Sequence, residues 1–108
     1  MKRGDLYRVR RPPGDPKPAR VFVVVSRQSS IDSSFSTIVC APVLSKRHGL
    51  PTEVAVGDAE GVKQDSAILC DGLMSIDKSR LTDFVGELSP AKLRELGGAL
   101  AAALSLRK

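Results

Sequence analysis

Hydrophobic and polar positions follow the period of a β-strand through most of the chain and the period of a helix at its end. Short runs that alternate, or that are apolar throughout and rich in β-branched residues, predict strands. These runs are residues 6–9, 21–25, 37–44, 52–56, 66–70, 73–76 and 82–88. Residues 11–19 hold four of the seven prolines and are predicted to form a loop. Residues 28–34 and 77–80 each favour a single helical turn, the second with Asp77 as its N-cap.

The period changes at Ser89, which is a good N-cap and is followed by a proline suited to the first helical position. Apolar residues then recur at helical spacing, at Leu93, Leu96, Leu100, Ala103 and Leu104. We expect this stripe to belong mostly to the core rather than to a dimer seam. The Gly97-Gly98 pair inside it indicates either close packing of the helix or a weak helix. Short strands followed by one helix predict a mainly β fold, a small barrel carrying a C-terminal helix, as a single domain over residues 1–108.

Composition says more about the class of partner than about the fold. The 108 residues carry a net charge of +5, which favours an anionic partner such as nucleic acid or an acidic protein segment, although a merely basic surface is an equal alternative. Four aromatic side chains are too few for a surface that stacks many bases. No apolar run approaches the roughly 20 residues of a membrane helix, and no apolar segment follows the basic N-terminus, so a cytoplasmic protein is expected.

The usual catalytic side chains are scarce. His48 is the only histidine, which excludes a nuclease with a histidine acid–base pair and favours a surface turn for His48 itself. Cys40 and Cys70 lie in apolar runs and are expected to be buried thiols. Asp65, Asp71 and Asp77 could hold Mg²⁺, but aspartates at turns more often bond to their own backbone. No metal and no cofactor is therefore predicted.

Arg20 is the strongest candidate for a functional side chain. It lies between the proline-rich loop and a buried strand, so its backbone should be rigid. A guanidinium held in this way can bind a phosphate through two parallel hydrogen bonds. The competing interpretation is a structural ion pair with Asp5 or Glu53.

At these residues the chain resembles the MazF/PemK family, the toxins of bacterial toxin–antitoxin pairs. The resemblance covers nearly the whole chain, and Arg20 before the valine strand is one of its marks. The others are Lys2-Arg3-Gly4-Asp5-Leu6-Tyr7, Phe35-Ser36-Thr37-Ile38-Val39-Cys40-Ala41-Pro42, Asp65-Ser66-Ala67-Ile68-Leu69-Cys70-Asp71 and Ile76-Asp77-Lys78-Ser79-Arg80-Leu81. It implies a barrel of the Src-homology-3 type that forms a homodimer. It also implies a sequence-specific, metal-independent endoribonuclease, and an antitoxin partner whose acidic tail occupies the RNA groove.

The resemblance assigns the catalytic arginine to Arg20, and this chain departs from the family pattern in three places. The family threonine falls on Leu44, the family proline after the arginine is Val21, and Gly72-Leu73-Met74 stands where the family often carries a basic side chain. Ser45 follows Leu44 at once and is the expected replacement for the missing hydroxyl. The expected RNA-binding residues are Arg11, Lys17, Lys46, Arg47 and Asp71.

RNA carries its own nucleophile, the ribose 2′-hydroxyl, so cleavage needs cations and orientation rather than a protein nucleophile. In-line attack on single-stranded RNA would leave a 2′,3′-cyclic phosphate and a 5′-hydroxyl, with Arg20 stabilising the charge that builds on the phosphate oxygens. No general base is evident. Two alternatives stay open: a non-catalytic barrel that binds RNA or an acidic peptide, and a gyrase inhibitor resembling CcdB. The chain has no aromatic residue after Phe84, which argues against the second.

Overall fold

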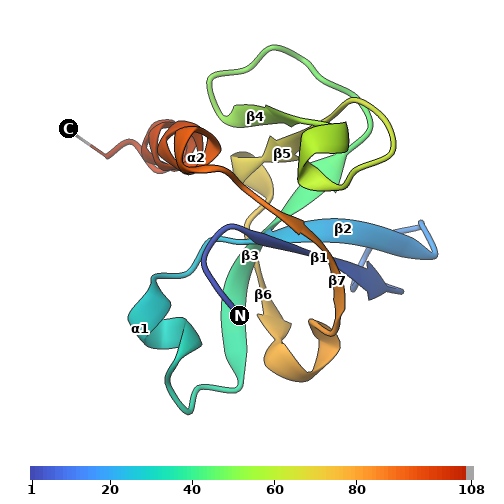
Figure 1. The fold of residues 1–108 in the computed structure, drawn as a ribbon, viewed down its shortest axis with the longest axis vertical. Helices are drawn as coiled ribbons and strands as arrows, with labels where there is room; N and C mark the ends of the chain where they lie inside the picture. The colour runs from blue at the N-terminus through green and yellow to red at the C-terminus, as the bar shows by residue number, and fades with distance from the viewer. Residues whose placement is uncertain (107–108) are drawn as a thin grey trace.

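A computed structural model describes residues 1–106 of the chain. Its main elements are short strands and a long C-terminal helix, as the period of the sequence predicts (Figure 1). The strands are β1 (Asp5–Arg10), β2 (Ala19–Val24), β3 (Thr37–Leu44), β4 (Glu53–Val56), β5 (Ser66–Leu69), β6 (Met74–Asp77) and β7 (Asp83–Glu87). The helices are α1 (Gln28–Ile31) and α2 (Pro90–Ala103), with single 3₁₀ turns η1 (Asp58–Glu60), η2 (Cys70–Gly72) and η3 (Lys78–Arg80).

All seven strands join one antiparallel sheet in the order β4-β5-β3-β2-β1-β7, and β6 pairs with the first half of β3. The long strand β3 belongs to both halves of this curled sheet, because its start pairs with β6 and its end pairs with β5. The predicted fold class, a small mainly β barrel with a C-terminal helix, is confirmed, and the curled sheet forms a half-barrel.

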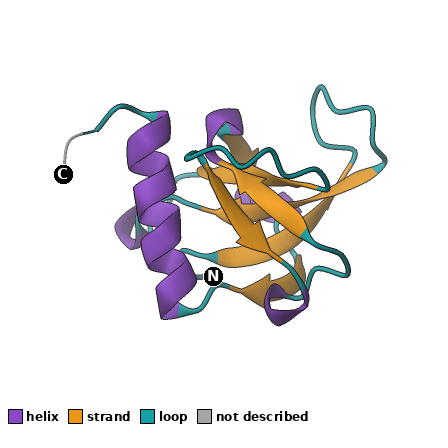
Figure 2. Ribbon diagram, turned by 90° about the horizontal axis from the view of Figure 1, so that it is seen from above, coloured by secondary structure: helices purple, strands orange, loops and turns teal. Residues whose placement is uncertain are grey.

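The two faces of the sheet bury two separate apolar clusters. One cluster lies between the sheet and α2, which covers this face in Figure 2, and it includes Val23, Val43 and Leu96. The other lies on the opposite face and includes Phe22, Cys40 and other apolar side chains of β1, β2, β3 and β6. Successive strand residues point to opposite faces, so neighbours such as Phe22 and Val23 enter different clusters.

Element boundaries differ from the sequence prediction at a few places. β2 begins at Ala19 rather than at residue 21, because the β1–β2 hairpin continues its pairing to Val9↔Arg20 and Arg10↔Ala19, beyond the apolar run. Arg20 therefore lies inside the strand, not before it. The predicted turn after β6 forms with Asp77 at its N-cap position, as predicted, but the Asp77 side chain makes no capping hydrogen bond.

The C-terminal helix begins as predicted. The Ser89 hydroxyl accepts a hydrogen bond from the Lys92 N–H at 3.2 Å, and Pro90 is the first helical residue. Leu96 is fully buried in the predicted stripe, whereas Leu104 follows the last helical residue and is 53% exposed. Gly97 has open space where a Cβ would lie, so close packing does not explain the glycine at this position.

Candidate functional site

Arg20 on β2 is held by three hydrogen bonds at the end of the sheet. Its Nε donates to Asp15 Oδ2, its Nη2 donates to Asp15 Oδ1 at 3.1 Å, and its Nη1 donates to the Val43 carbonyl oxygen at 3.2 Å. Both charged side chains are largely buried, with 13% of Arg20 and 15% of Asp15 exposed. These bonds fix the guanidinium in the ion pair of the competing interpretation, but its partner is Asp15 of the proline loop rather than Asp5 or Glu53.

The other two acids bond elsewhere. Asp5 accepts from the backbone N–H of Lys2 at 2.8 Å. Glu53 accepts from the backbone N–H groups of His48 and Gly49, both at 3.0 Å. Asp15, in the loop between β1 and β2, reaches Arg20 instead.

Two features close this loop at its base. Arg11 adopts a left-handed backbone with φ 47°, and its N–H donates to the Pro18 carbonyl oxygen at 2.7 Å. From outside the hairpin, Arg80 Nη2 donates to the carbonyl oxygens of Arg10 and, at 3.1 Å, of Arg11. Arg80 therefore ties η3 to the point where the loop leaves β1, and so supports the position of Asp15.

The ion pair changes the acidity of Asp15. Hydrogen bonds from Arg20 and then from the Lys17 backbone N–H, at 2.9 Å, lower the pKa of this carboxyl to about 2, and partial burial opposes them. Asp15 is consequently an anion at neutral pH and a weak base. Any phosphate that binds Arg20 through its two parallel donors must replace or rearrange this carboxylate.

A basic cavity of about 380 Å³ lies on the α2 side of the sheet at Arg20. Four cationic side chains line it, from three separate segments of the chain, and none of the described residues lining it is acidic. They are Arg8, Lys17, Arg20 and Lys63. Ser45, Gln64 and Ser66 add polar groups to the same cavity. A cavity with several cations and hydroxyl or amide donors is suited to a phosphodiester backbone.

The segment that supplies Lys63 and Gln64 follows η1, whose backbone packs closely against that of β7. A Cβ on Gly86 of β7 would lie 2.2 Å from the Glu60 carbonyl oxygen, and a Cβ on Gly61 would lie 2.2 Å from the Val85 carbonyl oxygen. Only glycines allow η1 and β7 to pack so closely. This contact holds the following residues at the edge of the basic cavity.

A second cavity of about 330 Å³, here called the proline-loop cavity, lies on the other face of the sheet beneath the loop. Arg20 and Asp15 line it, together with mainly apolar residues: Pro12, Pro13, Gly14, Pro16, Phe22, Pro42, Leu44, Leu69 and Met74. Arg20 thus borders a basic cavity on one face and an apolar cavity on the other.

Leu44 and Ser45 border different cavities. Leu44, at the family threonine position, lines the proline-loop cavity, whereas Ser45 lines the basic cavity with Arg20. The two residues are adjacent in the chain, so their side chains leave the end of β3 in different directions. Ser45 can therefore donate a hydrogen bond only to a phosphate in the basic cavity.

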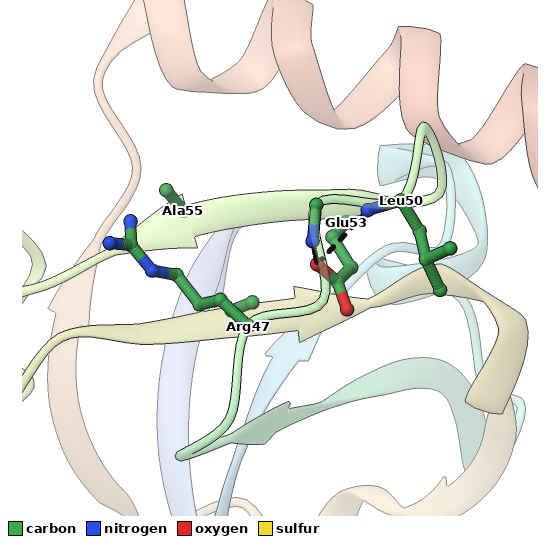
Figure 3. A pocket seen from close by; sticks show the side chains of 6 residues that line it. Arg47, Leu50, Glu53 and Ala55 are labelled. Atoms are coloured by element: carbon green, nitrogen blue, oxygen red, sulfur yellow. Dashed lines mark hydrogen bonds between the residues drawn. The ribbon is translucent and has the colours of Figure 1, made fainter.

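The remaining predicted RNA-binding residues do not line the basic cavity. Arg47 borders a hollow of about 460 Å³ over β4 and β5, with Leu50, Glu53 and Ala55 (Figure 3). Lys46 is exposed in the same loop.

Arg11 and Asp71 lie outside both cavities beside Arg20. Arg11 is exposed at the base of the proline loop, and Asp71 accepts a hydrogen bond from the Thr52 hydroxyl at 2.6 Å on η2. Of the predicted set, the structure brings together Arg20, Lys17 and Ser45.

Sequence reasoning missed Arg8, Lys63 and the partner Asp15. Arg8 lies opposite Val21 in the β1–β2 pairing, which places it on the face of the basic cavity. The alternation of β1 could have predicted that face. Lys63 lies in the turn-rich stretch before β5, where no period constrains its direction.

Both cysteines are buried, as predicted. Burial raises the pKa of Cys40 to about 12 and that of Cys70 to about 11, so neither thiol is an active nucleophile at neutral pH. His48 is exposed in the loop after β3. Within residues 1–106, no three histidine, cysteine or acidic side chains come together as a metal site. Over the same residues, no helix has the length and apolar character needed to span a bilayer.

Comparisons with known proteins agree with the predicted family. Residues 2–104 match the model of the PemK-like, MazF-like toxin of type II toxin–antitoxin systems. Endoribonuclease EndoA of Bacillus subtilis is 32% identical, over 98% of this chain and 96% of its own length. Endoribonuclease MazF4 of Mycobacterium tuberculosis is 28% identical, over 96% and 92%.

Solved structures match at the level of the fold and of sequence. A mycobacterial endoribonuclease in complex with its cognate antitoxin superposes with a TM-score of 0.84 at 27% identity, over 100% of this chain and 98% of that one. MazF of Deinococcus radiodurans superposes with a TM-score of 0.76 at 26% identity, over 97% and 96%. The matched relatives are thus endoribonucleases, which is the class of enzyme predicted from the sequence. The chain belongs to the PemK-like, MazF-like toxin family of type II toxin–antitoxin systems.

Proposed function

We propose that this chain is a cytoplasmic toxin that cleaves single-stranded RNA at the basic cavity, without a metal ion, at preferred sequences. The observation that carries the proposal is the rigid Arg20 guanidinium at the wall of a cavity lined by four cations. Clustered cations attract a phosphodiester and repel a divalent metal ion. The endoribonuclease names of the relatives support the same activity.

The reaction uses the nucleophile of the substrate. The ribose 2′-oxygen attacks the adjacent phosphorus, the bond from phosphorus to the 5′-oxygen breaks, and the departing oxygen takes up a proton to become a 5′-hydroxyl. Arg20 stabilises the charge on the non-bridging oxygens, and a preorganised donor of this kind contributes roughly 3–4 kcal/mol in other enzymes. Ser45 donates a hydrogen bond to the same phosphate. Lys17, with Arg8 and Lys63, neutralises the flanking backbone.

Proton removal from the 2′-hydroxyl is not assigned to a side chain. The low pKa of Asp15, the carboxylate bound to Arg20, makes it a weak base. Bulk water can accept this proton. A slow chemical step is the expected consequence.

Two further parts of the proposal concern partners. The chain binds an antitoxin, and the positive charge of the basic cavity favours an acidic segment of that antitoxin there. The mycobacterial relative solved in complex with its cognate antitoxin supports this kind of partner. It also forms a homodimer. Light scattering at micromolar concentration should give twice the monomer mass of 11.5 kDa, and a monomeric mass would contradict the dimer.

One experiment tests the proposed activity. A long RNA is incubated with the protein in excess EDTA, and new 5′-hydroxyl ends are mapped. Cuts at a small set of recurring sequences are expected. Activity that EDTA abolishes and Mg²⁺ restores would overturn the metal-free mechanism.

A non-catalytic barrel is the second candidate, favoured by Leu44 at the family hydroxyl position and by the carboxylate already bound to Arg20. It predicts RNA binding with no new 5′ ends in the same experiment.

A further inference from the structure

We propose that the proline-loop cavity binds one unpaired nucleobase of the RNA, next to the phosphate held at Arg20, and that Leu44 and Met74 select that base. This inference rests on the proposed RNA cleavage and names a specificity site for it. The cavity has a volume of about 330 Å³, at the small end of the roughly 300–1,000 Å³ typical of small-molecule pockets.

The strand register places the cavity walls on one face of the sheet. Phe22 of β2 lies opposite Pro42 of β3, and alternation puts Arg20 on the same face as Phe22 and Leu44 on the same face as Pro42. Met74 of β6 lies opposite Cys40, which is two residues before Pro42. Three strands thus direct one cation and several apolar side chains into a single hollow.

The walls are formed before any ligand arrives. A Cβ on Gly72 would lie 3.0 Å from Pro42 Cγ, so η2 packs closely on the proline ring at the edge of the cavity. Phe22 is 1% exposed and forms a packed floor. Pro42, Leu44, Leu69 and Met74 are each partly exposed, which leaves apolar surface available to a ligand.

The chemistry of the lining favours a base over a phosphate. Leucine and methionine side chains would remove water from a phosphate without replacing its hydrogen bonds, which is costly. The faces of a nucleobase are apolar, and a methionine sulfur packs favourably against an aromatic ring. Leu44 and Met74, one from β3 and one from β6, lie in this one cavity.

The polar part of the lining also fits a base better than an apolar peptide side chain. Arg20 and Asp15 line the cavity and are hydrogen-bonded to each other, so a ligand that rearranges this pair meets one donor group and one acceptor group. The edge of a base carries both donors and acceptors, whereas an aliphatic side chain would leave both groups without new partners. Because Arg20 borders both cavities, a base here belongs to a nucleotide next to the bound phosphate.

The two methionines of the chain provide a direct probe. The methyl group of Met74 reports on the cavity, and that of Met1 is an internal control. The protein labelled with ¹³C-methyl methionine and with ¹⁵N in its backbone amides is titrated with short 2′-O-methyl RNA, which cannot be cleaved. Each of the four base compositions is used in turn. A matched oligomer of abasic nucleotides has the same phosphates. We expect at least one base composition to cause a ring-current shift of the Met74 methyl resonance. The abasic oligomer should cause none.

Each other outcome has a defined meaning. Shifts at the Lys17 amide with none at Met74 would overturn the base site while leaving RNA binding in place. No shift anywhere would overturn the proposed function and the base site together. A Met74 shift caused by a leucine-containing acidic peptide but not by RNA would assign the cavity to a peptide and overturn the proposal.

Cleavage-site mapping provides the second test. Leu44→Thr and Met74→Ala should each change the base preference at one position beside the cut by about tenfold, the size of effect that small changes in an apolar pocket produce. Lys17→Ala is the matched control, and it should weaken cleavage at all sites alike because it contacts the backbone. Unchanged base preference in both cavity variants would contradict the proposal.

Discussion

Arg20 and Asp15 form a bidentate ion pair, in which Nε and Nη2 of the guanidinium both donate to the one carboxylate. The carboxylate comes from the proline loop and occupies the donors that the bound phosphate would use. The loop therefore positions the guanidinium and also competes with the phosphate for its hydrogen-bond donors. RNA binding and loop position must be coupled at this contact.

Replacing Asp15 with asparagine tests this coupling. Asn keeps the size of the side chain but removes the negative charge, so phosphate no longer competes with an anion at Arg20. The affinity for a non-cleavable RNA should rise by about threefold to tenfold, the effect of roughly 1 kcal/mol. Asp32→Asn, on an exposed site beyond α1, is the control for net charge and should change affinity less. A loss of affinity in Asp15→Asn would show that the carboxylate mainly orients the guanidinium.

The same ion pair should contribute to stability in acid. The pKa of Asp15 is lower in the folded protein, about 2, than its ordinary value of 3.8, because Arg20 and the Lys17 N–H stabilise the anion. This contribution is present above pH 3.8 and is lost as the pH falls towards 2. Urea unfolding from pH 5 to pH 2.5 should show a steeper loss of stability in wild type than in Asp15→Asn. Parallel curves for the two proteins would contradict the lowered pKa.

The sequence could predict the rigid position of Arg20 but not its partner. The apolar run after Arg20 identifies a buried strand, and a strand fixes the backbone of its residues. The reach of Asp15 depends on left-handed backbone at Arg11 and Gly14, with φ 47° and 71°, and no periodicity encodes those angles. The basic cavity was missed in part for the same reason, because Lys63 follows a turn whose direction depends on the packing of η1 against β7.

The buried thiols should be inert in the folded protein. Burial raises the pKa of both Cys40 and Cys70 above 10, so the reactive thiolate is scarce at pH 8. A disulfide exchange reagent should label fewer than one thiol per chain within minutes under native conditions and both thiols in urea. Fast labelling of the native protein would mean that one of the two apolar clusters opens readily.

The apolar stripe of α2 divides into core and surface. Leu96 is fully buried, and Leu96→Ala should lower the free energy of unfolding by about 2–5 kcal/mol. Leu104 is 53% exposed, and Leu104→Ala should change it by less than about 0.5 kcal/mol. Urea unfolding measures both. An equal cost for the two variants would indicate that a partner covers Leu104. The helical period identified the stripe, but the period alone could not show that the helix ends at Ala103.

The central claim is that Arg20 acts on the reacting phosphate, and single-turnover cleavage of a long RNA in excess EDTA tests it most directly. Arg20→Ala should slow cleavage by on the order of 10²–10³, because one preorganised charge donor is lost. RNA affinity should fall far less, because Arg8, Lys17 and Lys63 still contact the backbone. A circular dichroism spectrum checks that the variant is folded. If folded Arg20→Ala cuts as fast as wild type, Arg20 is only a structural partner of Asp15, and the proposed site is wrong.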